Sequence, residues 1–126
     1  MEKKRILIVD DQEDSRMILK SILENEGYAV DTVFNGEEAL EIYPTKSFNL
    51  VMTDINMTGI SGIELLRSIK SINDDAVVIL LTGFSDIEKT QQAVKYGAAD
   101  YILKPVQPLQ FLKSIKKALS KESSIK

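Results

Sequence analysis

The chain has 126 residues, a formal net charge of −3, and neither cysteine nor histidine. This length suits one domain that buries roughly two thirds of its unfolded surface, and the small charge offers no strong field to nucleic acid or to an anionic membrane. The lack of cysteine excludes a disulfide framework and a thiolate metal site. The first apolar run is too short for a signal peptide or a membrane span, so we expect a cytoplasmic protein that contacts neither nucleic acid nor membrane directly.

Four apolar runs without alternation predict strands that are buried on both faces. They cover residues 6–11 (ILIVDD), 50–54 (LVMTD), 77–82 (VVILLT) and 101–105 (YILKP), and each ends on polar or charged residues. A weaker run between the first two, residues 28–34 (YAVDTVF), alternates imperfectly, which favours an edge strand. In open α/β sheets ligands bind at the strand tips, so the polar residues at these tips are the candidate site.

Segments with helical spacing of apolar residues alternate with these runs. The predicted stripes are Ile18, Leu19, Ile22 and Leu23; Ala39, Leu40 and Tyr43; Leu65, Leu66, Ile69 and Ile72; and Leu109, Leu112, Ile115 and Leu119. Residues 86–96 carry a thin stripe of Ile87, Ala93 and Val94, so we expect the least firmly packed helix there. Five β-α units predict a parallel sheet with right-handed crossovers and helices on both faces.

Capping residues mark the expected helix boundaries. The expected N-caps are Asp14 or Ser15, Asn35, Ser61 and Ser85. Gly27 and Gly97 lie where left-handed helix ends often fall, and Pro44 is expected to close the second helix. The predicted domain covers residues 1–120, and residues 121–126 are interpreted as a polar tail or the start of a linker.

Two adjacent carboxylates, Asp10 and Asp11, follow the first buried strand. Like charges at about 4 Å repel by about 4 kcal/mol at an effective dielectric near 20, so the pair indicates a compensating cation. The alternative is that one of the two merely caps the next helix. Asp54 ends a second buried strand, and three carboxylates together suit Mg²⁺ rather than zinc or copper.

A carboxylate can also attack phosphorus and form an acyl phosphate, which makes Asp54 a candidate nucleophile. A lone aspartate at a strand end is more often a cap or a loop acid, and only its neighbours favour this chemistry. Because the chain has no histidine, any imidazole in the reaction must come from a partner.

Three further residues complete the candidate constellation. Thr82, followed by Gly83, could bond a phosphoryl oxygen, and Lys104 before Pro105 could act as a point charge on phosphate. Taken alone, Lys104 is most simply an ordinary surface lysine, and Tyr101 is most simply a core-packing residue.

The last predicted helix carries a lysine-rich face, which is either simply solvated or an interaction surface: Lys113, Lys116, Lys117 and Lys121.

These residues resemble a known family over nearly the whole chain, the receiver domain of two-component response regulators. The matching positions are the pair Asp10 and Asp11, Asp54 in TDINM, Thr82 with Gly83, and Lys104 with Pro105. Residues 97–105 (GAADYILKP) are also very similar to the segment that precedes the last helix in this family.

The resemblance implies a single flavodoxin-like (βα)5 domain, an α/β fold whose five-stranded parallel sheet has the order 2-1-3-4-5. It implies that Asp54 is the phosphoacceptor. Asp10, Asp11 and Asp54 would hold Mg²⁺ together with the backbone carbonyl of Asn56.

The resemblance also implies a switch. Lys104 would pair with the phosphoryl group, Thr82 would turn to bond it, and Tyr101 would turn inward as Thr82 moves. The change would reach an output face formed by the last two helices and the last strand. The protein would catalyse its own phosphorylation and slow dephosphorylation, without turnover of an external substrate.

Two positions depart from the family's usual pattern. The loop after Asp54 reads Met57 and Thr58 where the family often has Met-Pro, which leaves its shape less constrained. Phe84, two residues after Thr82, lies where side chains can gate the hydrolytic water. We hypothesise that Phe84 slows dephosphorylation together with Asn56.

The expected partners follow from this interpretation. They are a sensor histidine kinase or histidine phosphotransferase as phosphodonor, and a downstream effector protein or an effector domain missing from this chain. A homodimer through the last two helices is compatible with the pattern but is supported by no single residue. The alternatives are an interaction module that is never phosphorylated and a haloacid dehalogenase-type phosphohydrolase, although Asn56 replaces the second aspartate of that type. A flavin carrier is disfavoured by the acidic first loop.

Overall fold

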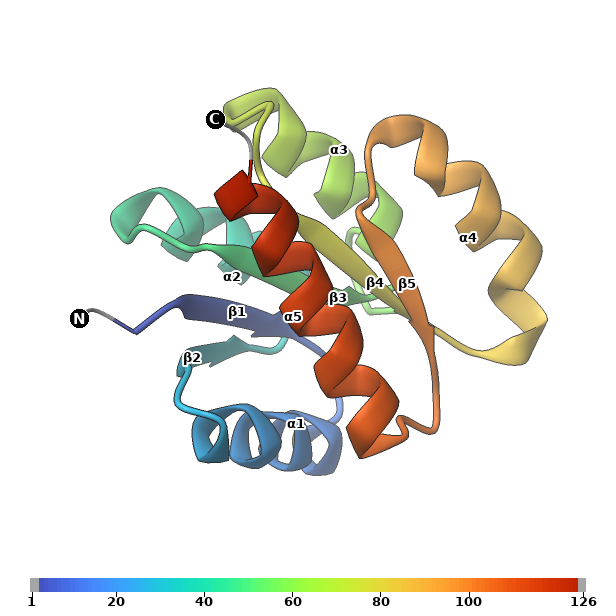
Figure 1. Cartoon of the computed structure of the whole chain (residues 1–126). Coiled ribbons are helices and arrows are strands. Elements are labelled where there is room, and N and C mark those ends of the chain that lie inside the picture. The colour runs from blue at the N-terminus through green and yellow to red at the C-terminus, as the bar shows by residue number, and fades with distance from the viewer. Residues whose placement is uncertain (1–2, 125–126) are drawn as a thin grey trace.

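The computed structural model describes the backbone of residues 3–124 and the side chains of residues 3–120. Its centre is a parallel sheet with the strand order β2-β1-β3-β4-β5 (Figure 1). The strands are β1 (Arg5–Val9), β2 (Ala29–Val33), β3 (Leu50–Asp54), β4 (Val78–Thr82) and β5 (Asp100–Leu103). The predicted flavodoxin-like order is confirmed, and β2 is an edge strand as expected.

Helices connect the strands and cover both faces of the sheet (Figure 1). They are α1 (Glu13–Asn25), α2 (Gly36–Ile42), α3 (Gly62–Ile72), α4 (Ile87–Ala93) and α5 (Pro108–Ser124). Short 3₁₀ turns extend three of the connections: Tyr43–Thr45 after α2, Phe84–Asp86 before α4, and Val94–Tyr96 after it. Pro44 lies in the first of these turns, directly after α2, as expected.

Two hydrophobic cores form on opposite faces of the sheet because successive residues of a buried strand point to opposite sides. In β1, Leu7 and Val9 face a core shared with α2, α3 and α4. Ile6 and Ile8 face the other core, where α1 and α5 contribute Leu23 and the fully buried Phe111. This double burial explains why the strands read as continuous apolar runs.

The capping predictions are partly confirmed. The side chain of Asn35 accepts a hydrogen bond from the Glu38 amide, and Ser61 forms a reciprocal capping box with Glu64. Gly27 and Gly97 end their helical segments with positive φ. The prediction of Asp14 or Ser15 as a cap is wrong, because α1 starts after Gln12 and no side chain caps it.

The predicted cap Ser85 is also wrong, since it lies inside the 3₁₀ turn that precedes α4. Several residues of the predicted apolar stripes are exposed rather than packed: Ile18, Ile72, Val94 and Leu109. Within α4 only Thr90 and Ala93 are buried, which agrees with the expected thin contact.

The C-terminal helix is longer than the expected domain. It continues to Ser124, whereas residues 121–126 were predicted to be a tail or linker. Residues 125–126 and the side chain of Lys121 lie outside the described part of the chain, so the domain boundary at residue 120 stays a prediction. Among the described residues, no helix is both long and apolar enough to cross a membrane.

Candidate functional site

The strand order brings three carboxylates together at the C-terminal edge of the sheet. β1 pairs with β3 so that Val9 lies beside Thr53, and the residues that follow, Asp10 and Asp54, therefore meet. The side chains of Asp10, Asp11 and Asp54 offer oxygen atoms that all lie within 4.8 Å of one another. Asp10 is fully buried, Asp54 is half-buried, and Asp11 is exposed.

Lys104 completes this cluster from the end of β5. Its Nζ donates hydrogen bonds to Asp10 Oδ2 at 3.0 Å and to Asp54 Oδ2 at 3.2 Å. The Lys104–Pro105 peptide bond is cis. The alternative that Lys104 is an ordinary surface lysine is wrong, because its ammonium group pairs with two of the three carboxylates.

The first turn of α1 holds Asp10 in place. Ser15 Oγ donates to Asp10 Oδ2 at 2.6 Å, and the amide of Gln12 donates to Asp10 Oδ1 at 3.0 Å. Arg16 donates to the backbone carbonyl of Asp10 at 2.7 Å. The sequence analysis predicted Ser15 as a possible N-cap of the helix and not as a partner of Asp10, because a serine near a helix start fits both roles. The capping alternative for Asp10 itself is wrong, since Gln12 occupies the N-cap position.

Burial and charge act in opposite directions on these groups. Burial raises the pKa of the Asp54 carboxyl, the Lys104 ammonium opposes that effect, and the Asp10 and Asp11 carboxylates add to it, so that the net shift is upward. Burial lowers the pKa of Lys104, but its contacts with Asp10 and Asp54 outweigh burial and raise this pKa above its ordinary value. Lys104 therefore stays charged at neutral pH.

The donor set fits a hard divalent cation. Three carboxylates face one ammonium group, so two negative charges are left uncompensated in the cluster. Carboxylate oxygens are preferred ligands of Mg²⁺, whereas zinc and copper sites draw on imidazole and thiolate groups that this chain lacks. The site can therefore accommodate Mg²⁺ beside Lys104.

The predicted switch residues lie on the side of the site nearest α4. Thr82 ends β4 and is buried, and its hydroxyl lies 2.9 Å from Thr90 Oγ1 and 3.2 Å from the Gly83 carbonyl. Tyr101 on β5 is half-buried and packs against the core shared with α2, α3 and α4. Its hydroxyl lies 3.5 Å from Gln91 Nε2 on α4.

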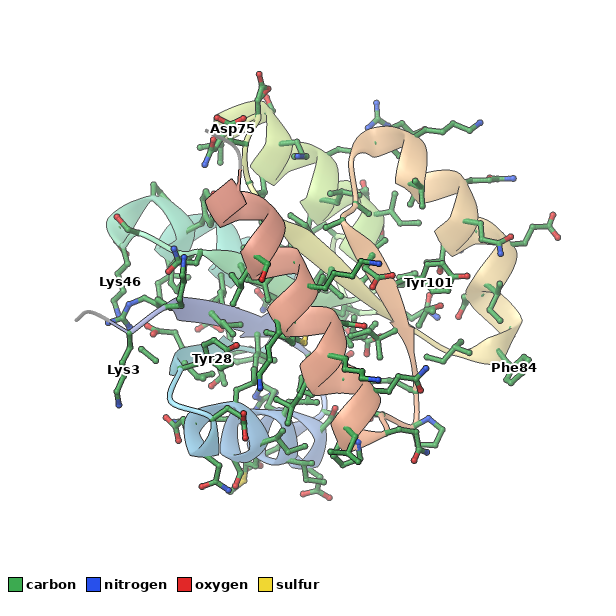
Figure 2. All side chains as sticks on the ribbon, viewed as in Figure 1. Lys3, Tyr28, Lys46, Asp75, Phe84 and Tyr101 are labelled. Atoms are coloured by element: carbon green, nitrogen blue, oxygen red, sulfur yellow. The ribbon has the colours of Figure 1, made fainter. Side chains whose placement is uncertain are left out.

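A hydrogen bond joins the loop after β3 to the turn after β4. Asn56 donates from Nδ2 to Asp86 Oδ2 at 2.6 Å, which joins the loop after β3 to the turn before α4. The Phe84 side chain is 80% exposed and projects outward from that turn (Figure 2). Sequence reasoning missed Asp86 and Thr90, although the four-residue spacing of Asp86 and Thr90 places them on one helical face.

The backbone at the start of α3 packs closely against the backbone of Asp54. At Gly62, the first residue of α3, an added Cβ would collide with the backbone oxygen of Asp54. Only glycine lets α3 start against the end of β3 in this way.

Comparison with known proteins agrees with this geometry. A family model described as the response regulator receiver domain matches residues 6–116. The chain belongs to this family. Receiver domains are the signal-accepting parts of two-component systems, so the prediction of the family and of its signalling role is confirmed at that level.

Two curated relatives of similar length match almost end to end, and a longer one matches over part of its length. Sporulation initiation phosphotransferase F of Bacillus subtilis is 32% identical, and the match covers 98% of this chain and 100% of that protein. Chemotaxis protein CheY of Halobacterium salinarum is 40% identical over 93% of this chain and 98% of that protein. Transcriptional regulatory protein ZraR of Salmonella typhimurium is 36% identical over 91% of this chain, which spans only 26% of that longer protein.

Solved structures share the fold of this receiver domain. A receiver domain protein from Clostridium thermocellum has a TM-score of 0.92 and 33% identity, with 98% of this chain and 99% of that chain covered. Response regulator TrrA from Thermotoga maritima, solved in complex with Mg²⁺-BeF, has a TM-score of 0.83 and 39% identity, with 91% and 98% covered.

Proposed function

We propose that this receiver domain is a phosphorylation-activated switch whose phosphoacceptor is Asp54. A carboxylate oxygen of Asp54 attacks the phosphorus of a phosphohistidine, an O–P bond forms, the N–P bond breaks, and the imidazole leaves. The histidine belongs to a sensor histidine kinase or a histidine phosphotransferase, because this chain has none. The observation that carries the proposal is the convergence of Lys104 with Asp10 and Asp54.

Mg²⁺ is the proposed cofactor. Asp10, Asp11 and Asp54 would hold it together with the backbone carbonyl of Asn56. Bound there, the ion would supply positive charge that offsets the carboxylates and the incoming phosphoryl group. The Mg²⁺-BeF complex of TrrA supports this assignment by analogy.

The residues of this chain have distinct tasks in the proposed reaction. Lys104 already pairs with Asp54 and keeps its charge, so it can follow the new phosphoryl group and balance part of its charge. The Thr82 hydroxyl turns toward that group, and Tyr101 turns inward as Thr82 moves. Asn56 and Phe84 limit the access of the water that hydrolyses the acyl phosphate.

The proposed output surface is formed by α4, β5 and α5, where Tyr101 connects the switch to the outside. A downstream effector protein, or an effector domain outside these residues, would read its change. Dimerisation through α4 and α5 is one form that this output can take. We place this chemistry in the cytoplasm, where a sensor kinase would have access to ATP.

Intact mass spectrometry with acetyl phosphate as donor tests the proposal. The protein should gain one phosphoryl group in the presence of Mg²⁺ and none in EDTA. Asp54→Asn should abolish the adduct, whereas the matched control Asp74→Asn, an acid at the opposite end of the sheet, should retain it. A folded protein that gains no adduct would instead be an interaction module that is not phosphorylated, and sustained release of phosphate from monoesters would indicate a phosphohydrolase.

A further inference from the structure

A buried hydroxyl pair lies between the switch strand and α4. Thr90 is fully buried, and its Oγ1 lies 2.9 Å from Thr82 Oγ1 and 2.8 Å from the backbone oxygen of Asp86. Thr82 is itself 1% exposed, so neither hydroxyl can readily exchange its partner for water. The pair is therefore a buried hydrogen bond that is lost when the Thr82 hydroxyl turns away from α4.

Each hydroxyl of the pair carries a single proton and can accept in addition. Thr90 can donate to Thr82 while Thr82 donates to the Gly83 carbonyl at 3.2 Å, or Thr82 can donate to Thr90 while Thr90 donates to the Asp86 carbonyl. In both arrangements the Thr82 hydroxyl is hydrogen-bonded to Thr90 on α4.

Asp86 extends the same network to the other side of the site. Its carboxylate accepts from Asn56 in the loop after β3, while its backbone carbonyl accepts from Thr90. The loop that follows the phosphoacceptor strand, the turn before α4 and the switch strand are thus joined through hydrogen bonds of 2.6 to 2.9 Å.

We propose that Thr90 is a positioning residue that holds the Thr82 hydroxyl against α4 in the unphosphorylated state. The proposal rests on the proposed function, in which Thr82 must leave this position to bond the phosphoryl group. Phosphorylation then replaces the Thr90 contact by a contact to a charged acceptor. The loss of this contact loosens the packing of α4 on β4, and α4 is part of the proposed output surface.

This role makes a directional prediction. Removing the Thr90 hydroxyl weakens only the unphosphorylated arrangement, so the activated arrangement becomes easier to reach. A neutral hydrogen bond of ordinary strength corresponds to a change of about two- to tenfold in the switching equilibrium. A residue that merely fills space would not show this dependence on the hydroxyl.

Two variants separate the hydroxyl from the packing. Thr90→Val keeps the shape and removes the hydroxyl, whereas Thr90→Ser keeps the hydroxyl and removes a methyl group. We would titrate wild type and both variants with beryllofluoride, a phosphoryl mimic, in the presence of Mg²⁺, and follow amide signals by NMR. We expect Thr90→Val to bind about two- to tenfold more tightly and Thr90→Ser to bind like wild type. Unchanged or weaker binding by Thr90→Val, or equally tight binding by Thr90→Ser, would overturn the proposal.

A second measurement keeps this test separate from the proposed function. The side-chain rotamer of Thr82, obtained from three-bond couplings without Mg²⁺ or beryllofluoride, reports on the contact directly. We expect a single rotamer in wild type and in Thr90→Ser, and averaging in Thr90→Val. A single unchanged Thr82 rotamer in Thr90→Val would refute the positioning role of Thr90, even if beryllofluoride binds. A wild type that fails to bind beryllofluoride would refute the proposed function, and averaging in Thr90→Val alone would still support the contact.

Discussion

At the scale of single residues, the site depends on an excess of negative charge that the protein does not neutralise by itself. Lys104 offsets one of three carboxylates, and Asp10 is further held by Ser15 and by the Gln12 amide. The negative charge that remains on Asp54 and the exposed Asp11 can be offset by a bound cation. Burial is the main cause of the raised pKa of Asp54, and the Asp10 and Asp11 carboxylates add to that shift.

Phe84 provides a prediction about the lifetime of the phosphorylated state. Phe84→Ala should shorten the half-life of the phosphoryl group, because a smaller side chain at the entrance admits water more easily. The half-life follows from intact mass at intervals after removal of the donor. Leu109→Ala, which removes an equally exposed apolar side chain at the start of α5, should leave the half-life unchanged. An unchanged or longer half-life in Phe84→Ala would refute the role of the ring.

Asp31 provides a prediction about pH. Burial raises its pKa, but the side chains of Lys46 and Arg5 outweigh burial and hold the pKa below its ordinary value. The resulting stabilisation is present above the ordinary carboxyl pKa and is lost as the pH falls through the lowered folded value. Asp31→Asn should therefore lower the free energy of unfolding by about 1 kcal/mol at pH 7, and the difference should shrink as the pH falls toward the lowered pKa.

Urea unfolding at pH 7 and at pH 3 measures this dependence. Asp75→Asn is the control, because Asp75 is exposed and forms no salt bridge with another residue in the described part of the chain. A difference between wild type and Asp31→Asn that is equal at both pH values would contradict the assignment.

At the scale of elements, the start of α3 is the most constrained junction near Asp54. Gly62→Ala would place a Cβ against the Asp54 backbone and should destabilise the fold by about 1–3 kcal/mol. Gly83→Ala is the matched control, because its Cβ would meet no heavy atom within 4 Å. Thermal and urea unfolding compare the two variants, and equal stability of both would contradict the close packing of α3 on β3.

The sequence predicted β1, β3 and β4 well because they are buried on both faces and need unbroken apolar runs. The run over β5 was also predicted to be buried on both faces, but β5 lies at the other edge of the sheet and is mostly half-buried. Helix starts were harder to predict. Asn35 and Ser61 cap their helices as expected, whereas Ser15 bonds Asp10 and Ser85 lies within a 3₁₀ turn. A polar residue near a helix start can serve the helix or the site, and only the tertiary arrangement decides between these roles.

At the scale of the whole molecule, the site exists because the strand order brings distant residues together. Lys104 and Asp10 are 94 positions apart in sequence, and they meet because β1 and β5 end at the same edge of the sheet. That edge could be predicted from parallel strands alone. The pairs Thr82 with Thr90 and Asn56 with Asp86 could not, because they depend on how α4 packs against the strand tips.

The most direct test of the account is to locate the phosphoryl group itself. Borohydride reduces an acyl phosphate of aspartate to homoserine, which tandem mass spectrometry can place in the chain. After treatment with acetyl phosphate and Mg²⁺, we expect homoserine at position 54 and at no other carboxylate, and none in EDTA. Homoserine at Asp10 or Asp11, or none at position 54 in the folded protein, would contradict the assignment of Asp54 as the phosphoacceptor.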